Sequence, residues 1–256
     1  MALDLAGLFL IAVFGLVVGS FFNVCIYRIP RKESLAWPSS HCPTCSHPLS
    51  TLDLIPVFSF IFLRGRCRYC KAHISWRYPV VELLTAVLWI LAWLKFGLSL
   101  EFLSAAVFLS LGIIITFIDL DQQIIPDVIS LPGVIIGLLL ALLSGRPPIT
   151  DALIGAFGGA ALLFLVAFLS HGGMGGGDAK LLAMIGAFLD WQGAAAALMI
   201  GSFAGAIIGL LLIALKVIKR RDPVPFGPFL IFGAGIYLFF SEFIIDFYAM
   251  LVSGWL

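Results

Sequence analysis

The chain has 256 residues, of which 62% are apolar and 11% are charged, and its mean hydropathy is +1.14. Soluble domains contain about half apolar and about a quarter charged residues, so this composition excludes an ordinary soluble protein. The net charge of +1 gives no indication of a nucleic acid partner, and we expect none. We predict an all-α, polytopic transmembrane helix bundle surrounded by lipid.

Eight segments are candidate membrane spans, because crossing the hydrocarbon core requires about 20 apolar residues, or fewer in a short buried helix. In chain order they are residues 5–25, 79–97, 102–119, 128–143, 151–170, 179–190, 194–216 and 228–250, of which 179–190 is the shortest. No basic residue precedes the first span, and the small residues Gly19 and Ser20 lead into the apolar segment FFNV at 21–24 and not into a polar mature start. We therefore expect a retained first helix at 1–24 and not a cleaved signal peptide.

One polar block, residues 25–78, interrupts the apolar pattern after the first span. It contains eight Lys and Arg residues against two acidic residues, and a second basic cluster lies at 216–221. Six spans separate the two clusters, which therefore share one side, and the basic bias of short loops marks this side as cytoplasmic. The block is expected to be a cytoplasmic loop domain, followed by a membrane domain at 79–256. The loops around 119–127 and 171–178 then also face the cytoplasm.

The polar block carries two C-x-x-C pairs with 21 residues between them: Cys42, Cys45, Cys67 and Cys70. Two such pairs at this separation indicate a structural zinc site of four thiolates. The metal would supply folding energy to a loop with few apolar residues. Two disulfides are the alternative, but the cytoplasm keeps thiols reduced. The fifth cysteine, Cys25, ends the first span and is expected to pack there.

Asp119 and Asp178 lie at the ends of apolar segments on the same predicted side of the membrane. Acidic residues at membrane depth are costly and are therefore candidates for function. Two carboxyl groups brought close together hold one proton between them, so that one can activate water and the other can polarise a peptide carbonyl. This is the chemistry of an aspartic peptidase.

A glycine-rich run at 172–177 precedes Asp178. Gly175 and Gly177 would let a substrate backbone approach the carboxylate, or let the loop adopt positive φ. The alternative is a flexible connector between two helices.

Three neighbouring charged residues have alternative explanations. Lys180 either extends towards water or counters the negative charge of the aspartates. Asp127 follows a proline and precedes an apolar segment, so we expect it to cap that helix. Glu82 lies inside the second span and is either a satisfied packing residue or a functional acid, with methyl transfer as its candidate role.

Taken together, several motifs resemble those of the bacterial type IV prepilin leader peptidases, the membrane aspartic peptidases with a G-x-G-D motif. Besides the two C-x-x-C pairs they are GSFFNVCIYRIP at 19–30, SWRYPVVELLTA at 75–86, IDLDQQIIPD at 118–127, GMGGGDAKLLAMIGAF at 173–188 and PFGPF at 225–229.

The resemblance implies that Asp119 and Asp178 are the catalytic pair. It implies substrates that are prepilins and pseudopilins of type IV pilus or type II secretion systems, cut after a glycine that ends a short basic leader. The cut would be made on the cytoplasmic side of the bacterial inner membrane. Members of the family commonly also methylate the new N-terminus with S-adenosylmethionine, an activity associated with the cysteine loop.

Other interpretations stay open at this point. A peptidase without methyltransferase activity would belong to the same family. An ion-coupled transporter would need acids near the bilayer centre and internal repeats, and we see no repeat. A zinc-binding scaffold for secretion components would leave the aspartates without a role. The sequence shows no G-x-G-x-x-G motif for the methyl donor, and it leaves the oligomeric state open, a homo-oligomer included.

Overall fold

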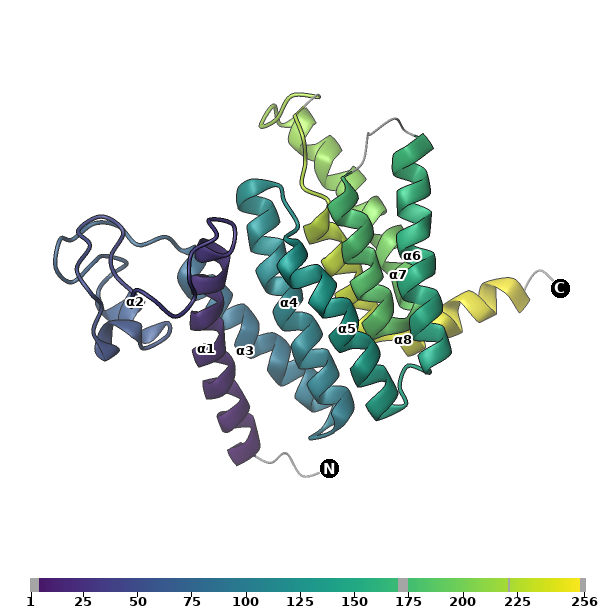
Figure 1. Ribbon diagram of the computed structural model, residues 1–256, viewed down its shortest axis with the longest axis horizontal. Coiled ribbons are helices and arrows are strands. Elements are labelled where there is room, and N and C mark those ends of the chain that lie inside the picture. The colour runs from purple at the N-terminus through teal and green to yellow at the C-terminus, as the bar shows by residue number, and fades with distance from the viewer. Residues whose placement is uncertain (1–4, 170–174, 221, 254–256) are drawn as a thin grey trace. The chain divides into compact units, whose positions relative to one another are not determined.

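A computed structural model describes residues 5–169, 175–220 and 222–253, and their regular elements are all helical (Figure 1). In chain order they are α1 (Leu5–Arg28), the 3-10 helix η1 (Thr51–Leu54), α2 (Phe58–Phe62), α3 (Arg77–Phe96), α4 (Leu100–Gln122), α5 (Asp127–Ser144), α6 (Ile149–Leu169), α7 (Gly176–Ala214) and α8 (Gly227–Ser253). Among these residues there is no β-strand, only two isolated β-bridges in the polar block. The prediction of an all-α fold is confirmed.

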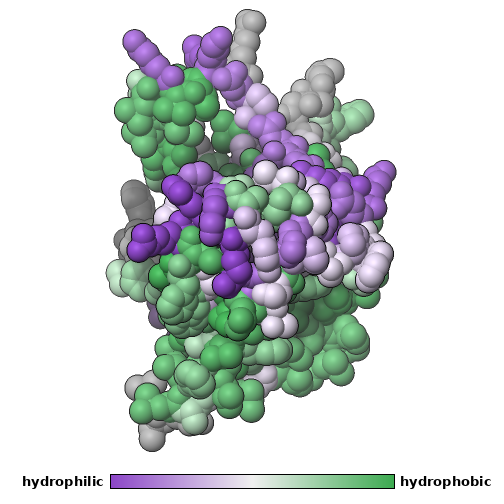
Figure 2. Space-filling model, turned by 90° about the vertical axis from the view of Figure 1, so that its left-hand side faces the viewer, coloured by the Kyte–Doolittle hydropathy of each residue, from purple (hydrophilic) through white to green (hydrophobic). Residues whose placement is uncertain are grey.

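Seven of the described helices are long and apolar enough to cross a membrane, namely α1 and α3 to α8. Their outward side chains are large and apolar, as for Phe9, Phe157 and Phe203, which are all largely exposed. A surface of this kind requires lipid as its solvent. In the space-filling view, hydrophilic residues gather on one part of the visible face while apolar residues cover much of the rest (Figure 2).

The sixth and seventh spans that we expected from the sequence are joined in α7 (Gly176–Ala214). Its backbone breaks at Asp190, where φ is 68° and ψ is −175°. A continuous helix of 39 residues would be about 58 Å long, yet Gly175 before α7 and Pro223 after it line the same cavity. The chain therefore turns back at Asp190. Its two legs, 176–189 and 191–214, correspond to the expected spans 179–190 and 194–216, so the described helices include both expected spans, joined in one element.

The chain divides into two compact units, Met1–Leu98 and Ser99–Leu256. The first unit holds α1, the polar block and α3. α1 and α3 cross closely, because a Cβ atom on Gly15 would lie 2.7 Å from Ala86 Cα, and one on Gly19 would lie 2.8 Å from Glu82 Cα. Small residues four apart allow such close packing of membrane helices. α3 therefore clusters with α1, whereas we placed the start of the membrane domain at residue 79.

The second unit is built around α7, which packs against α5, α6 and α8, while α4 packs against α5 and α8. Its core lies between these helices and includes fully buried side chains of α4 and α7: Ile115, Ile118, Leu181, Leu182, Met184 and Ile185. α6 and α7 approach most closely at Gly155 and Gly186, where an added Cβ on Gly186 would lie 2.2 Å from the Gly155 carbonyl carbon. This packing brings the C-terminal end of α4 and the N-terminal end of α7 together at one edge of the unit.

Candidate active site and metal centre

Asp119 lies in the last turn of α4 and is only 4% exposed. The helix ends at Gln123, which adopts the left-handed conformation at φ 55° and donates its backbone N–H to the Asp119 carbonyl oxygen at 2.8 Å. A left-handed residue is a common helix terminator. The Gln123 side-chain amide then donates to the Pro223 carbonyl oxygen at 3.1 Å. These bonds connect the end of α4 to the segment that leads into α8.

Asp178 lies in the first turn of α7, where Gly175 is the N-cap residue. Asp119 and Asp178 line one cavity of about 720 Å³, together with parts of the segments 123–127 and 223–226. The two carboxyl groups are close enough to interact electrostatically. The structure thus brings together the two aspartates that the sequence singled out, although 59 positions separate them (178 less 119).

Gly227 contributes to the site and was not assigned from the sequence. It is the first residue of α8, and its backbone N–H donates to Asp119 Oδ2 at 3.0 Å. A Cβ atom at this position would lie 2.7 Å from the same oxygen. The motif PFGPF, which we noted only for its resemblance to the family, carries this glycine. The absent side chain is what lets the amide reach the carboxylate.

Gly175 and Gly177, the two glycines that we singled out before Asp178, do not adopt the positive φ that we suggested as one of their two roles. Gly175 has φ −71°, and Gly177 lies in the helix, so neither adopts positive φ. Gly177 instead allows close packing within the chain, because a Cβ there would lie 3.0 Å from Ile125 Cβ, and the approach of a substrate backbone stays a prediction. Both glycines line the aspartate cavity. Residues 172–174 of the run lie outside the described part of the chain.

Lys180 and Asp127 form an ion pair at the same cavity. Lys180 Nζ lies 2.7 Å from both carboxylate oxygens of Asp127. Our prediction that Asp127 caps α5 is wrong, because Pro126 is the N-cap residue and Asp127 is the first residue of the helix. The lysine neutralises Asp127 directly, whereas we expected it to extend to water or to counter the catalytic pair.

The four cysteines of the polar block converge, as predicted. Their Sγ atoms all lie within 4.8 Å of one another, and those of Cys42 and Cys70 are 3.8 Å apart. Four sulfur atoms at 2.3 Å from a tetrahedral zinc ion would be separated by about 3.8 Å. None of the four forms a disulfide. Burial opposes ionisation of Cys42, but hydrogen bonds with Cys45 and Thr44 outweigh it and lower the pKa of this thiol to about 6. The donor set fits one metal ion.

The two cysteine pairs form one local structure twice, 25 positions apart. In the first, Cys42 N–H bonds the His47 carbonyl and Ser46 N–H bonds the Cys42 carbonyl. In the second, the corresponding bonds run from Cys67 to Ala72 and from Lys71 to Cys67. Ser46 and Lys71 both have positive φ, 57° and 62°. We saw no internal repeat in the sequence, and the structure corrects this for the short segments 41–50 and 66–75.

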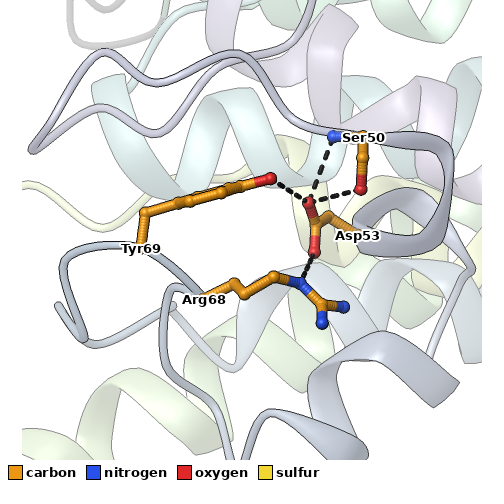
Figure 3. Close-up of polar contacts among 4 residues, drawn as sticks. All are labelled: Ser50, Asp53, Arg68 and Tyr69. Atoms are coloured by element: carbon orange, nitrogen blue, oxygen red, sulfur yellow. Dashed lines mark hydrogen bonds and ion pairs between the residues drawn. The ribbon is translucent and has the colours of Figure 1, made fainter.

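Asp53 fastens the second cysteine pair to η1 (Figure 3). Its side chain is 3% exposed and accepts hydrogen bonds from the Ser50 backbone and hydroxyl, from Arg68 Nε at 2.6 Å and from the Tyr69 hydroxyl. Burial disfavours the charged form, but the bonds from Arg68 and Ser50 outweigh it and lower the pKa of Asp53 to about 2. A fixed negative charge therefore holds the loop between Cys67 and Cys70.

Glu82 is 6% exposed between α1 and α3. Its carboxylate accepts the backbone N–H of Val57 at 2.7 Å and a hydrogen bond from Ser20. One turn before Glu82 in α3, the Tyr78 carbonyl oxygen accepts a hydrogen bond at 3.1 Å from the side-chain amide of Asn23 in α1. The Oδ1 atom of Asn23 is buried with no hydrogen-bond partner. The structure places Glu82 in the first unit with the cysteines and not among the residues of the aspartate cavity.

Comparison with known proteins covers both units. Residues 13–96 match the bacterial peptidase A24 N-terminal domain, and residues 106–210 match the type IV leader peptidase family. No solved structure matches the chain significantly.

Curated relatives match almost the whole chain. A protein of Aeromonas salmonicida (strain A449), named prepilin leader peptidase/N-methyltransferase, is 38% identical over 269 residues, covering 93% of this chain and 92% of the relative. Proteins of the same name from Bacillus subtilis (strain 168) and Pseudomonas aeruginosa are 37% and 35% identical and cover 94% and 89% of this chain and 98% and 88% of their own lengths. With this identity over nearly its full length, the chain belongs to the type IV leader peptidase family.

Proposed function

We propose that the chain is a bifunctional membrane enzyme, which cleaves the leader peptide of type IV prepilins and pseudopilins and then N-methylates the new N-terminus. The observation that carries the peptidase assignment is the cavity of the second unit. It presents two carboxyl groups at helix ends, one of them fixed by a backbone amide. The relatives, which carry the same combined name, support both activities.

Asp119 is the member of the pair that we assign as the ionised base. The Gly227 N–H and the positive end of α8 lie against its Oδ2 atom, and both favour negative charge there. The free oxygen, Oδ1, would take a proton from water as the water oxygen attacks the scissile carbonyl carbon. Asp178 in its protonated form would donate a hydrogen bond to the carbonyl oxygen as negative charge develops on it.

The tetrahedral intermediate then collapses with proton transfers through the same groups. The proton held by Asp119 passes to the departing amine as the C–N bond breaks, while Asp178 keeps its own proton and remains hydrogen-bonded to the oxygen as the new carboxyl group forms. One peptide bond and one water become a carboxylic acid and an amine. Both aspartates return to their starting states without a covalent intermediate.

The site is assigned to the cytoplasmic side of the inner membrane, with the leader cut after its terminal glycine. The polar block carries the larger excess of basic residues, which marks the cytoplasmic side. Gly175 and Gly177 line one wall of the cavity, along which an extended substrate backbone would lie. Lys180 holds Asp127 neutralised beside that wall and limits the acidic charge at the cavity.

The methyl transfer is assigned to the first unit. Cys42, Cys45, Cys67 and Cys70 would bind zinc with no open coordination position, so the metal would hold the loop and not act on substrate. S-adenosylmethionine would supply the methyl group, with a bond formed to the amine nitrogen as the bond to sulfur breaks. Glu82 is the candidate residue for this step, as the carboxylate that would accept the proton released from the amine, since it is buried beside the polar block.

The test is mass spectrometry of a purified prepilin incubated with the full chain in detergent, with and without S-adenosylmethionine. We expect loss of the leader in both cases and the mass of one methyl group only with the donor. Asp119→Asn and Asp178→Asn should each abolish cleavage without changing thermal stability. Cleavage that persists in Asp119→Asn would refute the catalytic pair. Cleavage with no donor-dependent mass would leave a peptidase alone.

A further inference from the structure

α2 presents an exposed apolar face that neither the aspartate cavity nor the cysteine site uses. Phe58, Ile61 and Phe62 are 56%, 64% and 83% exposed. Positions one turn apart share a helix face, so these side chains form a single patch. Phe60 points the other way and is buried against Trp76, with ring centroids 4.8 Å apart. One face of α2 is therefore packed against its own unit, and the opposite face is open.

The start of α2 lies beside the membrane-spanning helices of its unit, at a level between their two ends. Val57 precedes α2 and donates its N–H to Glu82 at 2.7 Å. Glu82 is the sixth residue of α3, about 8 Å along the axis from the first. It also faces Gly19, which lies nine residues before the end of α1 (28 less 19). The hydrogen bond thus holds the start of α2 beside both spans, inside their ends.

The backbone at Val57 fits this fixed position. Its φ of 63° is unusual for a β-branched residue. Strained conformations of this kind persist where the surrounding contacts hold them. The contact here is the Glu82 carboxylate, which is itself buried between α1 and α3.

Positive charge follows the apolar face directly. Arg64, Arg66 and Lys71 are exposed and, with His73, line a hollow of about 320 Å³. The polar block contains only two acids, and one of them, Asp53, is engaged by Arg68. Apolar side chains bordered by Lys and Arg are typical of segments that lie in the surface of an anionic bilayer.

We propose that α2 anchors the cysteine loop to the bilayer surface. Phe58, Ile61 and Phe62 insert at the boundary between headgroups and acyl chains, and the cations that follow bind anionic phospholipid headgroups. Both ends of the polar block continue into membrane-spanning helices, so bilayer lipid is always adjacent to this face. Cys67 comes five residues after Phe62, and the anchor thereby fixes the metal site relative to the membrane.

The first test places the photoreactive residue p-benzoylphenylalanine at position 62 of the full chain. The protein is reconstituted in nanodiscs of phosphatidylcholine and phosphatidylglycerol, irradiated and analysed by mass spectrometry. The same probe at Phe9, an exposed residue of α1, is the positive control. We expect phospholipid adducts at both positions. Adducts at position 9 without adducts at position 62 would overturn the proposal, as would a crosslink from position 62 to a second protein chain.

The second test measures which headgroup is captured. We expect phosphatidylglycerol to be enriched over its bilayer fraction in the position 62 adducts by about fivefold, the factor for one cation near an anionic surface. Replacing Arg64, Arg66 and Lys71 together by Gln should remove the enrichment but not the adduct. Replacing Lys216, Lys219 and Arg220 by Gln removes equal charge from the other basic loop and should leave it intact. Enrichment that survives the first triple replacement would refute headgroup binding by these cations.

Discussion

Asp119 and Asp178 have the same side chain but different surroundings. Asp119 carries a backbone hydrogen bond on Oδ2, and Asp178 stands at the start of α7 near the glycines of the cavity wall. Under the proposed mechanism, the hydrogen bond from Gly227 to Oδ2 leaves Oδ1 as the oxygen of Asp119 that receives the proton of water. A single glycine amide would thus orient the proposed base.

Gly227→Ala tests this arrangement directly. The new Cβ would lie 2.7 Å from Asp119 Oδ2, so the carboxylate or the start of α8 must move. Displacement of a catalytic group by about 1 Å costs about 100-fold in rate. We expect kcat for prepilin cleavage to fall by about this factor, while methylation of a prepilin already lacking its leader is unchanged.

Gly235→Ala is the matched control, because it lies in the same helix and an added Cβ would meet no atom within 4 Å. It should cleave at the rate of the parent protein. A parent-like rate in Gly227→Ala would show that the amide does not position the base.

At the scale of elements, the crossing of α6 and α7 depends on one glycine face. A Cβ on Gly155 would lie 2.6 to 2.7 Å from the backbone of Asp190 and Trp191, where α7 turns back. Backbone atoms cannot rotate away, so Gly155→Ala should destabilise the second unit by about 1–3 kcal/mol. Gly158→Ala on the same helix meets nothing within 4 Å, and we expect it to be neutral or slightly stabilising. Thermal unfolding of both variants in detergent checks the difference, and equal Tm values would contradict it.

The cysteine loop depends in the same way on the contact between η1 and the second cysteine pair. Asp53→Asn keeps the shape but removes the charge that Arg68 and Tyr69 share (Figure 3). A hydrogen bond to a charged group contributes about 1.5–3 kcal/mol to stability. Because Arg68 is half exposed and water screens its charge, we expect the variant to lose stability at the lower end of this range. We expect the Asp53→Asn variant to release its metal at a several-fold lower chelator concentration than the parent. Metal analysis of the purified full chain after chelator treatment measures this. Glu33→Gln, an exposed acid of the same block, should behave like the parent.

The pH dependence of this contact has a definite sign. The pKa of Asp53 falls from its ordinary value of 3.8 to about 2 on folding. The stabilisation is therefore complete above pH 3.8 and is lost as the pH falls through about 2. The deficit of Asp53→Asn should accordingly be constant near neutral pH, and a deficit that grows between neutral and mildly alkaline pH would point to another group.

At the scale of the whole molecule, the features predicted from the sequence are those with a local signal. Apolar length identifies the spans, cysteine spacing identifies the metal site, and the cost of acids at membrane depth identifies the two aspartates. The contact between Gly227 and Asp119 joins residues 108 positions apart and has no local signal. The ion pair of Lys180 with Asp127 joins residues 53 positions apart and also has no local signal, so the sequence suggested other partners for the lysine.

Two other differences have physical causes within the elements. The sequence predicts the two legs of α7 as separate spans, 179–190 and 194–216, but the structure joins them because the chain turns at Asp190 with no polar loop between them. The repeat of the cysteine pairs is carried by backbone hydrogen bonds, and only Cys, Ser and an apolar position recur between its two copies. Conformation is repeated there with very little repetition of side chains.

The division into two units predicts that the two activities can be separated. The four cysteines and Glu82 lie within Met1–Leu98, whereas both aspartates, Gly227 and the cavity lie within Ser99–Leu256. Replacing all four cysteines by Ser removes the metal ligands, and a loop with few apolar residues then loses much of its folding energy. We expect donor-dependent methylation of a prepilin to be lost, with cleavage retained within about threefold of the parent, a change of less than 1 kcal/mol.

The converse variant, Asp178→Asn, should still methylate a prepilin supplied without its leader, and mass spectrometry reads both reactions in one sample. Loss of cleavage in a cysteine variant that keeps its helix content and Tm would mean that the peptidase requires the metal loop. No residue from the described part of the first unit lines the aspartate cavity. Such a loss would therefore mean that the metal loop affects cleavage from outside the cavity.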